Sequence, residues 1–171
     1  PVSGGQAVNS DPEDAAVWNY LCSILPLEAR QKLAEFNLFT DGTSNVLAYT
    51  SPIREEGVTD NTRFSISIDY FDVYDENGEK RDWSKLTYPI LHEYGHVLLE
   101  DETQVDLTVG RDTHDPAGFV EGAFRRAFYD AFWRELGVSG AGDYDRSSTH
   151  YVSRYGANYF HEDIADTFAV F

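Results

Sequence analysis

Hydrophobic positions along the chain change from helical spacing to strand spacing and back again. Residues 15–25 carry apolar side chains at helical spacing, and Pro26 opens a second short helix to about residue 36. A strand is expected at 46–49. At 64–69 apolar and polar residues alternate, which predicts a half-buried antiparallel strand.

The second half of the chain is predicted to be almost entirely helical. A helix begins near Thr87 and carries an apolar stripe along one side. An acidic, irregular segment follows at 101–115, and residues 116–136 have the spacing of one long amphipathic helix. The last helix begins near residue 158 or 159 and continues beyond Phe168.

This order of elements predicts an α+β fold in a single domain covering residues 1–171. We expect an N-terminal subdomain over about residues 1–100, with a small antiparallel or mixed sheet, and a helical C-terminal subdomain over about 101–171. Because 42% of the residues are hydrophobic and 15% are aromatic, the chain can bury a sizeable core.

Charge and cysteine content limit the possible partners and the location of the protein. A formal net charge of -17 argues against nucleic acid as a partner and would favour basic peptides. An acidic coat suits a secreted or cell-surface protein, here a mature chain without a signal peptide. No stretch approaches the roughly 18 apolar residues of a membrane span, and the lone Cys22 permits no internal disulfide. We expect a monomer.

The run His92-Glu93-Tyr94-Gly95-His96 is the strongest chemical feature of the sequence. Residues four apart share one face of a helix, so both imidazoles can bind one Zn²⁺ while the intervening glutamate acts as a general base. A catalytic zinc also needs a third protein ligand and an open position for water. The motif therefore predicts a zinc hydrolase whose third ligand lies elsewhere in the chain.

The positions after His96 exclude one family of zinc proteases. Metzincins carry a glycine and a third histidine three and six residues after the second histidine of this motif, where this chain has Leu99 and Glu102. A glutamate from a later helix is the alternative ligand. The candidates are Glu162, Glu121 as the second choice, and Glu135, which lies near a helix end and ranks last.

Glu162 is preferred because a second carboxylate, Asp166, follows one helical turn later on the same face. Asp166 would accept the spare ring N–H of a ligating histidine, with His92 the first candidate, and so fix its tautomer. An exposed acidic face near a helix N-terminus would produce the same pattern.

The two helices together resemble the gluzincin class of zinc metallopeptidases, which combine His-Glu-x-x-His with a downstream Glu-x-x-Ala-Asp/Glu. Residues 153–166 are similar to the closing segment of the anthrax lethal factor and Pro-Pro endopeptidase group and of related secreted bacterial proteins. The resemblance implies a zincin-like fold, with His92, His96 and Glu162 as ligands and Glu93 as general base and acid. It also implies Tyr155, seven residues before Glu162, as the oxyanion partner.

Two features depart from that group. Asp166 stands where glutamate is more usual, which shortens the arm that would reach the histidine. The N-terminal half contains no recognisable substrate-binding element, so Pro-Pro specificity does not transfer. Among the other histidines, His114, His150 and His161 are interpreted as surface or capping residues, although His150 or His161 would be an alternative partner for the oxyanion.

The sequence thus predicts a zinc-dependent endopeptidase that binds an extended peptide against a sheet edge, for which the strand at 64–69 is the first candidate. The alternatives are a non-catalytic zinc-containing binding or adhesion module and a non-proteolytic zinc hydrolase. Residues 72–79 contain several oxygen ligands and a turn at Asn77-Gly78, but they lack regular Ca²⁺-loop spacing, so a plain hairpin is favoured over a Ca²⁺ site.

Overall fold

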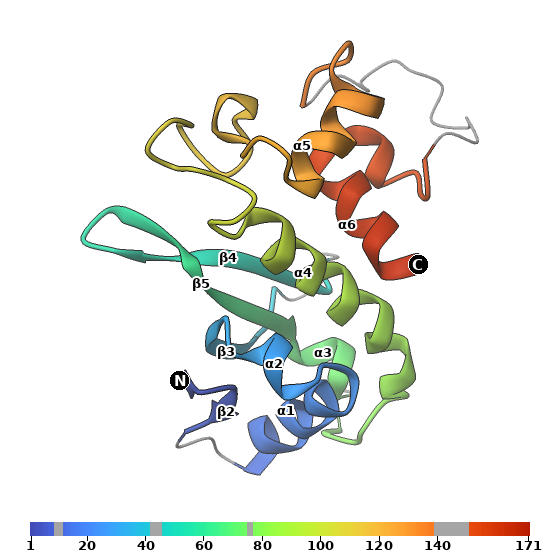
Figure 1. Cartoon of the computed structure of the whole chain (residues 1–171). Coiled ribbons are helices and arrows are strands. Elements are labelled where there is room, and N and C mark those ends of the chain that lie inside the picture. The colour runs from blue at the N-terminus through green and yellow to red at the C-terminus, as the bar shows by residue number, and fades with distance from the viewer. Residues whose placement is uncertain (9–11, 42–45, 75–76, 139–150) are drawn as a thin grey trace. The chain divides into compact units, whose positions relative to one another are not determined.

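The computed structural model describes residues 1–8, 12–41, 46–74, 77–138 and 151–171. These residues form an α+β protein with small sheets and several helices (Figure 1). Contacts divide the chain into two compact units, residues 1–93 and 94–171. The division falls inside helix α4 (Thr87–Glu100), which carries the His-Glu-x-x-His motif.

The first unit contains the sheets. Its elements are β1 (Val2–Ser3), β2 (Gln6–Ala7), α1 (Pro12–Ile24), α2 (Leu27–Arg30), β3 (Leu33–Phe39), β4 (Ala48–Glu55), β5 (Val58–Asp69), α3 (Tyr70–Val73) and the 3-10 helix η1 (Trp83–Leu86). The main sheet has the order β3-β5-β4, with β5 parallel to β3 and antiparallel to β4. In Figure 1, β4 and β5 form one long hairpin.

The expected strand at 64–69 exists, but its predicted place at the edge of the sheet is wrong. It is the second half of β5, which pairs with a strand on each side. The simple alternation also fails, because Ser67 and Asp69 are buried as fully as Ile66 and Ile68. A central strand covered on both faces buries consecutive residues, so its polar positions do not indicate solvent.

The short helix expected from Pro26 to about residue 36 ends early. Helix α2 stops at Arg30 because the chain from Leu33 onward pairs with β5, and tertiary pairing overrides the local pattern. The buried guanidinium of Arg30 donates to the carbonyls of Cys22 and Leu25 at 3.2 and 2.9 Å. It thereby satisfies carbonyl groups at the end of α1. Helix α1 itself confirms the helix expected at 15–25.

Other predicted elements of the first unit are confirmed in part. The strand expected at 46–49 is β4, which begins at Ala48 and continues to Glu55. Asn77 and Gly78 lie in a turn between the bridged residues Tyr74 and Lys80. The alternative Ca²⁺ loop at 72–79 lies partly outside the described residues.

The second unit has a small apolar core and few regular elements. After α4 it contains the 3-10 helix η2 (Pro116–Gly118), α5 (Phe124–Phe128), the π-helix η3 (Tyr129–Trp133), the 3-10 helix η4 (Gly156–Asn158) and α6 (Phe160–Val170). Its core consists of Leu99, Val105, Phe119, Trp133, Phe160 and Ile164. Helix α6 confirms the last predicted helix, and residues 101–115 are irregular as expected.

The single long helix expected at 116–136 is wrong. Phe119 forms a β-bridge with Val105, and Gly122 has a φ of 78°, so the chain leaves the helical path between η2 and α5. The expected apolar face is confirmed only in part. Phe119 is buried, but Phe124 and Phe132, which fit the helical spacing, are 59% and 66% exposed, and the fully buried Trp133 lies outside that spacing. Helical spacing therefore predicted neither the backbone of this segment nor all of its buried side chains.

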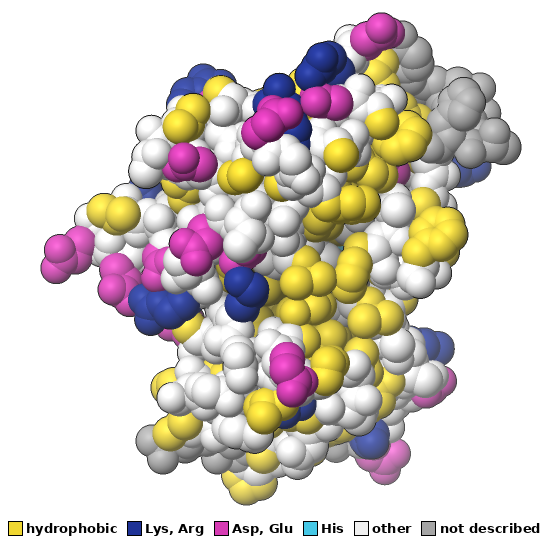
Figure 2. Space-filling model, viewed as in Figure 1, with side chains coloured by type: hydrophobic (Ala, Val, Ile, Leu, Met, Phe, Trp, Pro, Cys, Tyr) yellow, Lys and Arg dark blue, Asp and Glu magenta, His cyan; other side chains and the backbone are white. Residues whose placement is uncertain are grey.

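Among the described residues, no helix combines the length and the apolar character needed to cross a lipid bilayer. On the face shown in Figure 2, acidic side chains are spread among lysine and arginine side chains. The carboxylates on that face are thus dispersed.

Candidate metal centre

Helix α4 presents the three residues of the motif together. His92, Glu93 and His96 are all buried, with 7%, 7% and 9% of their surface exposed. Apolar neighbours on the same helix, including Ile90 and Val97, are almost fully buried and hold the helix in place. A pair of imidazoles four residues apart on such a helix shares one face, as the sequence predicted.

Gly95 explains how the third ligand reaches this helix. A Cβ atom at Gly95 would lie 3.1 Å from the Cα atom and 3.2 Å from the carbonyl oxygen of Ala165, which belongs to α6. A side chain at this position would push the neighbouring backbone away by a few tenths of an ångström, so glycine favours this close approach. Because Glu162 lies one turn before Ala165, this contact brings its carboxylate to His96.

His92, His96 and Glu162 form a group that could hold a metal ion. Each offers one ligand atom, and these atoms all lie within 4.8 Å of one another. The Nε2 atom of His96 is 3.4 Å from Oε2 of Glu162. Two ligands bound at about 2.0–2.2 Å to one tetrahedral zinc are roughly 3.3–3.6 Å apart, so this pair fits one ion.

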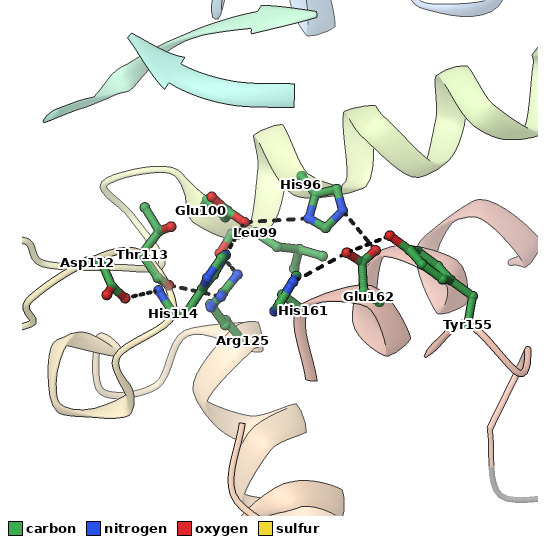
Figure 3. Close-up of polar contacts among 10 residues, drawn as sticks. All are labelled: His96, Leu99, Glu100, Asp112, Thr113, His114, Arg125, Tyr155, His161 and Glu162. Carbon is green, nitrogen blue, oxygen red and sulfur yellow. Dashed lines mark hydrogen bonds and ion pairs between the residues drawn. The ribbon is translucent and has the colours of Figure 1, made fainter. Parts of the chain in front are cut away.

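The second oxygen of Glu162 is held by two hydrogen-bond donors (Figure 3). The Tyr155 hydroxyl donates to Oε1 at 3.1 Å, and Nε2 of His161 lies 3.3 Å from the same oxygen. Burial lowers the pKa of His161, with a weaker opposing effect from Glu162, and so favours its neutral ring. The two donors fix the carboxylate so that Oε2 faces His96.

The other ring nitrogen of His96 faces a carboxylate that the sequence analysis did not select. Its Nδ1 atom is 3.5 Å from Oε1 of Glu100, and Nε2 of His114 is 3.1 Å from the same oxygen. Burial alone would raise the pKa of Glu100. Hydrogen bonds from His114 and His96 and the charge of Arg125 outweigh burial and hold that pKa well below its ordinary value.

Arg125 lies behind this group in the core of the second unit. It is fully buried, and it donates to the carbonyls of Leu99 and Thr113 at 2.7 and 2.9 Å. The rings of Phe119 and Phe160 lie 4.8 and 5.1 Å from its guanidinium carbon. Burial lowers the pKa of Arg125 to about 10, so the side chain remains a cation at neutral pH.

Asp166 is 2% exposed and is hydrogen-bonded to the Ser153 hydroxyl. The Ser153 oxygen in turn accepts the backbone N–H groups of Tyr155 and Gly156 at 3.0 and 2.9 Å. Asp166 therefore helps to fix the turn that carries Tyr155. The expected hydrogen bond from His92 to Asp166 stays a prediction.

The remaining candidates from the sequence have different positions. Glu121 and Glu135 are both exposed, and the group of potential metal ligands found among the described residues includes neither of them. His114 and His161 stack with ring centroids 4.1 Å apart, so both belong to the surroundings of the group and not to a separate surface. His150 lies outside the described residues.

Sequence reasoning missed Glu100, His114 and Ser153. Glu100 follows His96 by four residues, so helical spacing alone would have placed it beside that ring. His114 and Ser153 reach the group through irregular segments. No periodic pattern marks such positions.

Comparisons of the chain with protein-family models, with characterised proteins and with solved structures gave no significant match. A function for this chain is therefore inferred from its residues and their geometry.

Proposed function

We propose that this protein is a zinc-dependent endopeptidase with His92, His96 and Glu162 as the metal ligands. The observation that carries the proposal is the approach of the Glu162 carboxylate to His96 Nε2, on the helix face that also presents His92. Two imidazoles and one carboxylate are a donor set typical of catalytic zinc in peptidases. Mg²⁺ and Ca²⁺ prefer oxygen ligands and suit this set less well.

Zinc in this site would supply Lewis-acid activation of water and of a peptide carbonyl. Glu93, buried beside His92, takes the proton of the attacking water and passes it to the leaving amine. Tyr155 is 57% exposed, and its hydroxyl donates to Oε1 of Glu162. A phenol has a single O–H, so donating to the developing oxyanion would require this hydroxyl to leave Glu162.

The substrate class is proposed from the same chemistry and from the charge of the chain. A net charge of -17 favours peptides or proteins with basic segments and disfavours nucleic acid. We retain the proposal of a secreted or cell-surface monomer, because an acidic coat maintains solubility outside the cell.

The experiment is cleavage of a diverse peptide library by the purified, zinc-loaded protein, with the products read by mass spectrometry. Glu93→Gln should bind zinc but lose activity by at least about 10²-fold, because the base is missing. Glu102→Gln is the matched control, since this glutamate is exposed and lies outside the proposed site. It should cleave as the wild type does.

Three results would count against the proposal. Cleavage by Glu93→Gln at the wild-type rate would remove the assigned base. Cleavage that survives a chelator would remove the metal. Zinc bound tightly without any cleavage would favour a non-catalytic binding module or a hydrolase for another type of substrate.

A further inference from the structure

Glu100 occupies a position that is electrostatically unfavourable for a carboxylate. It is the last residue of α4 and is only 6% exposed. The C-terminal end of a helix carries partial negative charge, and burial removes the water that would stabilise the carboxylate. A glutamate at such a position requires specific partners.

Three cationic or donor side chains face Glu100 from different segments (Figure 3). His114 comes from the loop after α4, Arg125 from α5, and His96 from the preceding turn of α4 itself. Arg125 also bonds the carbonyl of Leu99, next to Glu100 in the chain, and so places its positive charge at the end of the helix.

The ring of His96 turns one nitrogen to each of two carboxylates. Nδ1 faces Oε1 of Glu100 at 3.5 Å, and Nε2 faces Oε2 of Glu162 at 3.4 Å. A metal held beside Glu162 would take the lone pair of Nε2, so the ring proton would then lie on Nδ1. An ionised carboxylate only accepts hydrogen bonds, so Glu100 is placed to accept that proton.

We propose that Glu100 is a positioning residue for the metal centre, which holds His96 in the Nδ1–H tautomer and so directs the Nε2 lone pair at the metal. His114 holds the Glu100 carboxylate in place by donating to the same oxygen. Partners of this kind orient a ligating histidine and raise its basicity. This inference rests on the metal centre of the proposed function but not on peptide hydrolysis.

The first measurement is the Nδ1 proton of His96 in the zinc-loaded wild-type protein, followed by proton and nitrogen-15 NMR. We expect this proton to exchange slowly with water and to resonate far downfield, because the buried Glu100 carboxylate accepts it. An Nδ1–H that exchanges as fast as that of an exposed imidazole would overturn the inference without any variant being made.

The second measurement is zinc affinity by competition with a chromogenic chelator. Glu100→Ala should bind zinc about 10–100-fold more weakly than the wild type. His114→Gln should lose less, because the Glu100 carboxylate remains. Glu102→Gln, two residues further along the chain and exposed, should bind as the wild type does.

A cobalt-substituted sample gives a signature that simple loss of stability would not produce. The visible absorption bands of bound Co²⁺ should shift in Glu100→Ala and remain unchanged in Glu102→Gln, because the geometry of the His96 ligand changes only in the first. His114→Gln carries the test if Glu100→Ala does not fold, since its side chain is 42% exposed.

The outcomes separate this inference from the proposed function. If the wild type binds no zinc, the metal centre itself fails, and with it the proposed function. If the wild type binds zinc and Glu100→Ala binds it equally well with an unchanged cobalt spectrum, the metal centre stands and the role of Glu100 fails.

Discussion

In residues 1–93, a three-stranded sheet and α1 bury mainly aliphatic and aromatic side chains, whereas residues 94–171 bury a network of charged groups beside a small core. In the first unit, aromatic contacts such as Trp18 with Phe36 join α1 to β3. In the second, Arg125 and Trp133 are fully buried next to carboxylates that accept their hydrogen bonds or balance their charge.

The two units also satisfy their backbone groups differently. The sheet of the first unit pairs N–H and C=O groups along its strands. In the loop after α4, the carboxylates of Asp101, Asp106, Asp112 and Asp115 each accept the N–H group two residues further on. In this loop, aspartate side chains thus accept backbone N–H groups that would otherwise pair in a β-ladder. The backbone can therefore follow an irregular path, which brings His114 to Glu100.

This difference between the units predicts that removing one buried charge from the second unit lowers the free energy of unfolding more than removing one methylene group from the first. Arg125→Ala leaves the Leu99 and Thr113 carbonyls without their donor and the Glu100 carboxylate without its cation. We expect a loss of about 3–5 kcal/mol in the free energy of unfolding. Urea unfolding measures it, and hydrogen exchange shows whether residues 94–171 lose protection first.

The control for that variant is the neighbouring Arg126→Ala. The Arg126 guanidinium is partly exposed and pairs with Asp130 at 3.1 Å, so its removal should cost less than about 1 kcal/mol. Equal losses for Arg125 and Arg126 would contradict the idea that the buried network organises the second unit.

A smaller effect is expected in the apolar core of the first unit. Ile66 is fully buried in the central strand β5, and Ile66→Val removes one methylene group there. The free energy of unfolding should fall by about 0.5–1.5 kcal/mol. Ser65→Ala, at a less buried position of the same strand, should change it by no more than about 0.5 kcal/mol. A loss for Ile66→Val as large as that for Arg125→Ala would remove the contrast between the units.

The smallest expected effect concerns the pH dependence of one loop aspartate. Backbone hydrogen bonds from Arg111 and Ala117, with the Arg111 side chain, lower the pKa of Asp115 to about 2. A carboxyl group with a depressed folded pKa contributes stability that is present above its ordinary value, near 3.8, and is lost as the pH falls toward about 2.

Asp115→Asn should therefore lower the midpoint of thermal unfolding slightly at pH 7, because it removes the charge and keeps an acceptor for Ala117. The difference from the wild type should shrink between pH 4 and about pH 2. A difference that grows on acidification would show that the carboxylate is not the stabilising form.

Local spacing predicted three of the helices correctly. Tertiary contacts decided the structure of the segments between them. Helices α1, α4 and α6 follow their apolar stripes. The helix expected after Pro26 yields to strand pairing, and the helix expected at 116–136 is interrupted at Phe119 and Gly122. Long-range pairing and a left-handed glycine leave little trace in a periodic pattern.

The sequence by itself determined that His92, Glu93 and His96 share one region of a helix, because the α-helical repeat depends only on neighbours along the chain. It also suggested Glu162, through a carboxylate pair one turn apart. Only the tertiary structure decided between Glu162, Glu121 and Glu135, because the close approach of Gly95 to Ala165 brings α6 to α4. The surroundings contributed by Glu100, His114 and Ser153 likewise depend on how distant segments pack, which residue spacing does not encode.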